Sequence, residues 1–334
     1  MPCPLIAMND QHDNGKLLSV APMMAWTDRH CRYLHRLCAA RPVLFTEMIT
    51  AGALCFGAAE RLLKFSDAEH PLAIQLGGSD PGQMAEAARR AADGGYDEIN
   101  INVGCPSPRV RRGAFGACLM REPALVARMV KAMRKACDRP VTVKCRLGVD
   151  DHDSQPLLEA FVGRIADAGC ERFYVHARKA LLNGLSPAEN RQIPPLCYER
   201  IYALKTRYPE LTIILNGGIT DIRAALEHLQ AVDGLMIGRQ AYRQPLFMNA
   251  LAHALHGEAP KDAFQIMADY MEYMDRELAA GTRLADMTRH CLGLFTGMPG
   301  ARHFRRLLSD HRRLKANDIS LVAQAMEQVR QRAA

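Results

Sequence analysis

The chain has 334 residues, of which 49% are hydrophobic and 24% charged, and its formal net charge is +7. This composition is that of an ordinary globular protein and excludes a disordered chain, while the modest positive charge permits an anionic partner without identifying one. No apolar run approaches the ~20 residues that span a bilayer, and residues 1–15 show no signal-peptide pattern. We therefore expect a cytoplasmic protein that makes no membrane contact.

Cysteine usage agrees with this location. The chain has 11 cysteines, an odd number, and none of them forms a C-x-x-C pair. Neither a zinc site nor a redox-active pair is predicted, and we expect no bound metal. Reduced thiols in a reducing compartment are the simplest explanation.

Short apolar segments recur along the first 237 residues, and helical patterns separate them. Residues 81–92 form the clearest helix, with Asp80 as its expected N-cap and Pro81 at its first position. Residues 122–137 and 221–229 also show helical spacing. Strands are expected at Leu17–Met23, Val43–Ile49, Leu72–Gly77, Glu98–Val103, Val141–Leu147, Arg172–Ala177, Thr212–Asn216 and Gly234–Ile237.

Strands that alternate with helices predict a parallel sheet, and eight such units match the size of a (β/α)8 TIM barrel, which is about 250 residues. The alternative is an open doubly wound sheet, which needs a G-x-G-x-x-G turn after its first strand. Residues 19–23 contain no glycine, so the barrel is favoured.

Beyond residue 245 only helices are predicted, at residues 247–255, 263–279, 283–294, 301–308 and 319–332. We therefore expect two domains, a barrel over residues 1–245 and a small helical bundle over residues 246–334. Between Arg283 and Lys315 the sequence has eight basic residues and two acidic ones, a local excess of +6. This excess fits either a solvated helix face or an RNA-facing surface.

Functional groups in such a barrel gather at the carboxyl ends of the strands. Gln75, Lys144 and His176 lie at three of these ends. A buried ammonium needs a partner, which is either an electron-rich or anionic ligand ring or a carboxylate. His176 alone would fit a structural role, but the three side chains together favour a ligand. The glycines at 217–218 and at 238 follow the last two strands, where barrels bind phosphate, although they would also serve as simple turns.

Residues 98–108 predict a strand that ends in a reactive turn. Apolar residues alternate with asparagines, and Gly104 and two prolines then stop the strand. The turn presents Asn102 and the thiol of Cys105, and an Arg-rich loop over residues 109–112 follows. A single cysteine is more often a small buried hydrophobe, but this position at a strand end favours a chemical role.

Eight segments, in order, resemble the tRNA-dihydrouridine synthases. The loop 113–120 and the stretch 178–196 are most similar to the bacterial A-type members of that family. The segments are APMMAWTD (21–28), QLGG (75–78), NINVGCPS (100–107), GAFGACLM (113–120), VTVKCRLG (141–148), FYVHAR (173–178), ILNGGI (214–219) and LMIGRQAY (235–242).

The resemblance implies an FMN-binding barrel with a helical tRNA-binding domain. FMN reduced by NADPH, or NADH, would reduce the C5–C6 bond of a flipped D-loop uridine, at positions 20 and 20a. Cys105 is implied as the general acid that protonates C5 after hydride reaches C6, a task for which a thiol is a far better acid than a hydroxyl. No NADPH motif is recognisable. The implied FMN-binding residues are Pro22, Met23, Met24, Gln75, Lys144, His176, Asn216, Gly217, Gly218, Gly238 and Arg239.

The target base must leave the RNA stack, so the tRNA must be held elsewhere, mainly through its phosphates. Asn102 is expected to hydrogen-bond the uracil edge, and Arg178 to stabilise the developing oxyanion or a flanking phosphate. Further expected tRNA contacts are the loop 109–112, Asn190, Arg191, Arg302 and Arg305. We expect the protein to act as a monomer.

Two other functions fit parts of the pattern. A reductase of a free pyrimidine, similar to dihydroorotate or dihydropyrimidine dehydrogenases, would use Cys105 and a flavin but leave the basic tail without a role. A non-catalytic RNA-binding module would need neither Cys105 nor a flavin. Binding of unmodified tRNA would argue against the reductase of a free pyrimidine, and bound flavin would exclude the non-catalytic module.

Overall fold

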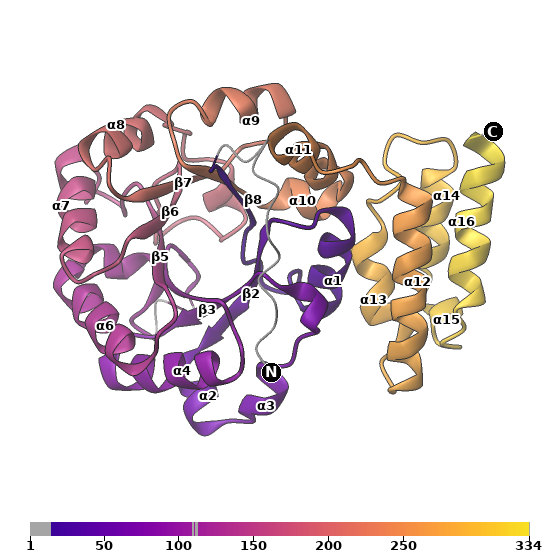
Figure 1. Ribbon diagram of the computed structural model, residues 1–334, viewed down its shortest axis with the longest axis horizontal. Coiled ribbons are helices and arrows are strands. Elements are labelled where there is room, and N and C mark those ends of the chain that lie inside the picture. Colours follow the sequence, from indigo (N-terminus) through magenta and orange to yellow (C-terminus); the bar gives the residue numbers. More distant parts are fainter. Residues whose placement is uncertain (1–14, 109, 111–112, 334) are drawn as a thin grey trace.

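The computed structural model describes residues 15–108, 110 and 113–333. Within them, eight parallel strands close into a barrel in chain order, as predicted, with β1 paired to both β2 and β8 (Figure 1). The strands are β1 (Leu17–Val20), β2 (Val43–Thr50), β3 (Leu72–Gly77), β4 (Glu98–Val103), β5 (Val141–Arg146), β6 (Arg172–His176), β7 (Thr212–Asn216) and β8 (Gly234–Ile237).

Side-chain alternation gives each strand an outer and an inner face. On β4 the two isoleucines and Val103 belong to the large apolar cluster between the barrel and its helices. The alternate residues Glu98, Asn100 and Asn102 are buried on the inner face. A smaller apolar cluster fills part of the interior and comprises Ala21, Phe45, Ala73, Tyr174, Ile214 and Met236.

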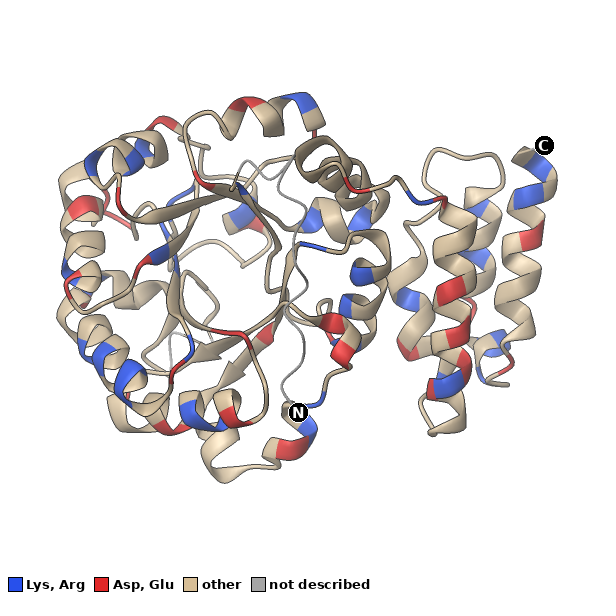
Figure 2. Cartoon of the chain, viewed as in Figure 1, with Lys and Arg blue, Asp and Glu red and all other residues tan. Residues whose placement is uncertain are grey.

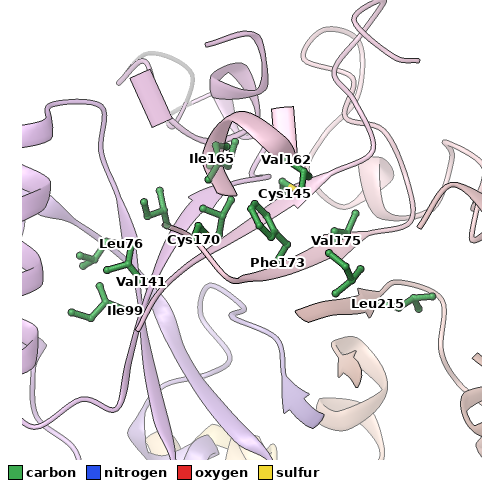
Figure 3. Close-up of a cluster of buried hydrophobic side chains, with 14 of the residues drawn as sticks. Leu76, Ile99, Val141, Cys145, Val162, Ile165, Cys170, Phe173, Val175 and Leu215 are labelled. Atoms are coloured by element: carbon green, nitrogen blue, oxygen red, sulfur yellow. The ribbon is translucent and has the colours of Figure 1, made fainter. Parts of the chain in front are cut away.

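Helices surround the barrel. They are α1 (Arg29–Cys38), α2 (Ala51–Phe56), α3 (Ala59–Leu62), α4 (Pro81–Asp93), α6 (Pro123–Ala136), α7 (Gln155–Ala166), α8 (Glu199–Arg207), α9 (Ile222–His228) and α10 (Arg239–Arg243), with 3-10 turns η1 (Asp67–Glu69), η2 (Gly116–Arg121) and η3 (Glu189–Arg191). The expected cap of α4 is confirmed, because the Asp80 carboxylate accepts from the N–H of Gln83 at 2.7 Å. Val162 and Ile165 of α7 pack in one cluster with Phe173 of β6 (Figure 3). Acidic and basic residues are interspersed along these helices (Figure 2).

The helices after residue 245 divide between two apolar cores. They are α11 (Leu246–His256), α12 (Ala263–Ala279), α13 (Leu284–Cys291), α14 (Ala301–Leu308), α15 (His311–Leu314) and α16 (Ser320–Ala333). Met248 and Leu251 of α11 join the barrel cluster, whereas the buried residues from Ala263 onward form a second cluster. Leu34 and Cys38 of α1 belong to that second cluster, so α1 lies between the barrel and the tail (Figure 1). α11 thus packs with the barrel, and the second apolar cluster takes its tail residues from Ala263 onward. No helix among the described residues is long and apolar enough to cross a membrane.

Candidate active site

A cavity of about 460 Å³ lies at the carboxyl ends of the barrel strands. The eleven residues expected to bind a cofactor all line it, and so do Cys105, Asn102 and Arg191. The rest of the wall is formed by Ala21, Trp26, Met48, Gly104, Pro106, Ser107, Arg146, Pro187, Ile219, Thr220, Met236 and Gln240. One cavity thus collects side chains from segments that are far apart in the sequence.

The turn that carries Cys105 is held by backbone contacts. The side-chain Oδ1 of Asn102 accepts from the N–H groups of Gly104 and Cys105, at 3.1 and 3.0 Å. The Cys105 carbonyl accepts from the N–H of Ala117 at 2.9 Å. Gly116 adopts a φ of +78°, and a Cβ there would lie 2.5 Å from the Cys105 oxygen, so glycine lets the two segments approach. These contacts fix the thiol-bearing residue at the cavity wall.

Lys144 brings an ammonium into the cavity wall. Its Nζ lies 3.0 Å from Oδ1 of Asn216, and the Asn216 amide nitrogen donates to the Met236 carbonyl at 2.7 Å. Within the described residues no carboxylate pairs with Lys144. Burial, assisted by the charge of Arg146, lowers the pKa of Lys144 to about 8. The site therefore supplies a cation that lacks an anionic partner of its own.

The environment of His176 favours its neutral form. Burial lowers its pKa well below the usual value, and the charges of Arg146 and Lys144 act in the same direction. Its Nδ1 atom is buried and has no hydrogen-bond partner among the described residues. A buried nitrogen without a hydrogen-bond partner beside a cavity calls for an explanation, and a bound ligand would supply one.

The glycines after β7 form a cradle. Gly217 and Gly218 have φ values of +116° and +74°, which residues other than glycine rarely adopt. A Cβ on Gly218 would lie 2.5 Å from Leu196 and 2.6 Å from the hydroxyl of Tyr198, and that hydroxyl donates to the Gly217 carbonyl at 2.9 Å. A Cβ on Gly217 would lie 3.2 Å from the ring of His176, so both positions favour glycine. Arg239 begins α10 on the same wall.

The sequence assigns no role to Arg146, which also lines the cavity. This buried guanidinium donates to the carbonyls of Gly104, Lys179 and Asn190 at 2.9 to 3.0 Å. It therefore joins the Cys105 turn to the loop after β6. The signal was its place two residues beyond Lys144, which puts both on one face of β5. Trp26, another missed residue, stacks on Tyr242 at 4.3 Å between ring centroids, a tertiary contact that no local pattern reveals.

The residues expected to contact tRNA lie in different parts of the structure. Asn102 and Arg191 line the cavity, and the Arg191 carbonyl accepts from Arg239 at 2.9 Å. Arg178 lies outside the cavity wall and donates to the Pro194 carbonyl. Arg302 and Arg305 are exposed on α14 in the tail. Of the Arg-rich loop, residues 109, 111 and 112 lie outside the described part of the chain.

Asn190 needs a correction. Its side chain is fully buried and its amide bonds to the backbone of the same loop, with Oδ1 2.7 Å from the N–H of Leu181 and Nδ2 2.9 Å from the carbonyl of Leu181. The expectation that this side chain contacts tRNA is therefore wrong for this structure. Its role is to hold together the loop that carries Arg191.

Comparison with known proteins connects this geometry to a family. The family model described as dihydrouridine synthase matches residues 19–331. A tRNA-dihydrouridine(20/20a) synthase of Vibrio cholerae is 51% identical over 93% of this chain and 96% of its own. Those of Xanthomonas axonopodis and Escherichia coli K12 are each 50% identical, over 97% and 96% of this chain and 97% and 93% of their own. A solved 2-naphthoyl-CoA reductase complex is similar with a TM-score of 0.56 at 11% identity, over 74% of this chain and 51% of that chain, which is a likeness of fold alone.

Proposed function

The chain belongs to the dihydrouridine synthase family, and we propose that it reduces the uridines at positions 20 and 20a of tRNA to 5,6-dihydrouridine. We propose FMN as its cofactor and NADPH, or NADH, as the reductant. The observation that supports this most strongly is that Cys105 and all the residues expected to bind FMN line one cavity at the barrel mouth.

The cavity fits FMN chemically. Lys144 offers a cation whose contact within the protein is a neutral amide, and the Nδ1 atom of His176 lacks a partner. The cradle at Gly217 and Gly218 lacks side chains, so its backbone N–H groups would be able to approach the phosphate of FMN closely. We propose that Gln75, Lys144 and His176 hold the flavin ring, that Pro22, Met23 and Met24 line it, and that Asn216, Gly217, Gly218, Gly238 and Arg239 hold the phosphate.

FMN held by Gln75, Lys144 and His176 would supply the hydride that C6 of the uracil accepts. Cys105 then donates its proton to C5, where negative charge has developed, and the thiolate recovers a proton from solvent. A thiol suits this step because its ordinary pKa, ~8.5, is far below that of a hydroxyl. His176 in its neutral form would hydrogen-bond the flavin without adding charge. Lys144 would stabilise negative charge in the same cavity.

We propose that the tail holds the tRNA while the base is flipped. Arg302 and Arg305 are exposed on α14, and phosphate contacts of this kind supply affinity without reading sequence. Arg191 in the cavity wall and Arg178 outside it would hold the phosphates that flank the flipped base. Asn102 would hold the uracil edge from its place in the cavity wall.

The test is direct. The purified protein is incubated with FMN, NADPH and an unmodified tRNA transcript, and dihydrouridine is mapped by mass spectrometry. We expect product at positions 20 and 20a that requires both FMN and NADPH. Turnover of free uracil or dihydroorotate without turnover of tRNA would favour a reductase of free pyrimidines. tRNA binding by a protein that takes up no flavin would leave only an RNA-binding module.

A further inference from the structure

A continuous line of hydrogen bonds runs through the barrel interior and ends at Cys105. We call its five side chains, Glu98, Thr142, Asn100, Gln75 and Asn102, the Glu98 chain. Thr142 Oγ1 donates to Glu98 Oε1 (2.7 Å), Asn100 Nδ2 to Thr142 Oγ1 (2.9 Å), Gln75 Nε2 to Asn100 Oδ1 (2.8 Å) and Asn102 Nδ2 to Gln75 Oε1 (2.7 Å). The last oxygen, Asn102 Oδ1, accepts from the N–H groups of Gly104 and Cys105.

Strand register builds this line. Glu98, Asn100 and Asn102 occupy alternate positions of β4 and so share its inner face. Asn100 pairs in register with Gln75 on β3 and with Thr142 on β5. All five side chains are buried, with exposed fractions between 0% and 8%.

The carboxylate gives the line a direction. Glu98 when ionised only accepts, so Thr142 must donate to it and can then only accept from Asn100. The Asn100 oxygen must consequently face Gln75, and the Gln75 oxygen must face Asn102. The backbone N–H groups of the Cys105 turn require an acceptor at the other end, so both ends demand the same orientation of each amide.

We propose that Glu98 is a positioning residue for the reaction: through the Glu98 chain it sets which edge of the Gln75 amide faces the flavin and it holds the turn that carries Cys105. This inference rests on the proposed function. The line ends on the backbone of Cys105 and not on its sulfur, so it orients groups and does not conduct protons to the thiol.

The decisive variant is Glu98→Gln, which keeps the shape and removes the charge. Arg172 Nη1 lies 2.6 Å from Glu98 Oε2 and would attract the carbonyl oxygen of the new amide. Its NH2 group would then face Thr142 and force the line to reverse, in conflict with the Cys105 turn. We expect FMN affinity to fall about tenfold, the value of one well-made hydrogen bond, and amide hydrogen exchange at Gly104 and Cys105 in the flavin-free protein to rise about fivefold.

The double variant Glu98→Gln with Arg172→Leu supplies the rescue. Without the guanidinium, the new amide can point its oxygen at Thr142 and donate to the hydroxyl of Tyr174, which lies 3.1 Å from Glu98 Oε2. We expect FMN affinity and exchange to return to within about threefold of wild type. Ser19→Ala is the matched control, because it removes a different buried hydroxyl of the barrel, 3.3 Å from the Leu235 carbonyl.

Wild-type affinity and exchange in Glu98→Gln would overturn the proposal, and so would equal losses in the double variant or in Ser19→Ala. If Glu98→Gln does not fold, Thr142→Val and Thr142→Ser carry the test, with loss expected for valine and recovery for serine. Hydrogen exchange needs neither flavin nor tRNA. A wild-type protein that makes no dihydrouridine would therefore refute the proposed function and, with it, the reaction that Glu98 is proposed to serve. Hydrogen exchange would still show separately whether the Glu98 chain holds the Cys105 turn.

Discussion

The Nε2 atom of His290 lies 3.0 Å from Oδ2 of Asp28, and this contact joins the helical tail to the barrel loop that lines the cavity. The other carboxylate oxygen of Asp28 caps α1 by accepting from the N–H groups of His30 and Cys31, each at 3.0 Å. Burial alone would raise the pKa of Asp28, but the hydrogen bond and charge of His290 help to hold it below its ordinary value. One carboxylate thus serves both the docking of the tail and the start of α1.

Asp28→Ala should cost more stability than the loss of a helix cap. A lost cap costs about 1 kcal/mol, and the loss of His290's partner adds about 1–3 kcal/mol. Urea unfolding measures the free energy, and Asp80→Ala, which removes the cap of α4 alone, is the control. Because the pKa of Asp28 is lowered, its contribution is complete above the ordinary value of 3.8 and is lost as the pH falls through the lowered pKa. Equal costs for the two variants would contradict this role of Asp28.

Cys105→Ala should abolish base reduction while the protein keeps FMN and tRNA. The loss of a general acid is expected to slow product formation at least about a hundredfold. Single-turnover formation of dihydrouridine by the pre-reduced enzyme measures this step. Cys55→Ala removes another partly exposed thiol, on α2, and should leave the rate unchanged. Full activity of Cys105→Ala would refute the assignment.

Lys144→Met should weaken FMN binding about tenfold or more at pH 7, because a charge-assisted contact is lost. In the wild type the pKa of Lys144 is about 8, so the ammonium loses its proton as the pH rises above that value. FMN affinity of the wild type should therefore fall between pH 7 and pH 9, and that of Lys144→Met should change less. Quenching of flavin fluorescence gives both constants. Parallel pH curves for the two proteins would exclude this role for Lys144.

Gly218→Ala should damage the flavin site. The new Cβ meets Leu196 and Tyr198 below 3 Å at a backbone angle that alanine adopts with strain. We expect a loss of about 1–3 kcal/mol in unfolding free energy together with a large drop in FMN affinity. Gly281→Ala is the control for strain alone, because its φ is +87° and nothing lies within 4 Å. An unchanged FMN affinity in Gly218→Ala would argue against the cradle.

The double variant Arg302→Ala with Arg305→Ala should weaken tRNA binding and reduce the slope of its salt dependence by about two, one for each lost phosphate contact. NADPH oxidation by the FMN-loaded enzyme should not change. Arg223→Ala is the control, because it removes another exposed arginine, on α9 of the barrel. If tRNA affinity and salt slope match those of Arg223→Ala, the tRNA lies elsewhere.

The fold could be predicted because strands and helices leave patterns within short stretches of sequence. Alternation and apolar runs located the eight strands, and α12 and α14 begin and end at the predicted residues. β1 is the clearest error, since it ends at Val20 and not at Met23. The N–H of Ala21 still bonds to β8, but Pro22 has no N–H to continue the ladder. The short helix α15 was not predicted, because four residues carry too little periodicity.

The site was predictable at strand ends and not in loops. Gln75, Lys144 and His176 follow from β-strand register, which places their ends at one rim. Pro187 and Trp26 reach the cavity only through the path of their loops. Asn190 shows the limit most clearly, since a polar residue beside an arginine gave no sign that it is buried within its own loop.

The place of α1 between two cores has a consequence for biosynthesis. The tail segments that cover Leu34 and Cys38 begin at Ala263, more than two hundred residues later in the chain. At ~5–20 residues per second, a ribosome needs roughly ten to forty seconds to make that interval. During this time the nascent chain carries an uncovered apolar stripe on its first helix, which is the kind of surface that chaperones bind.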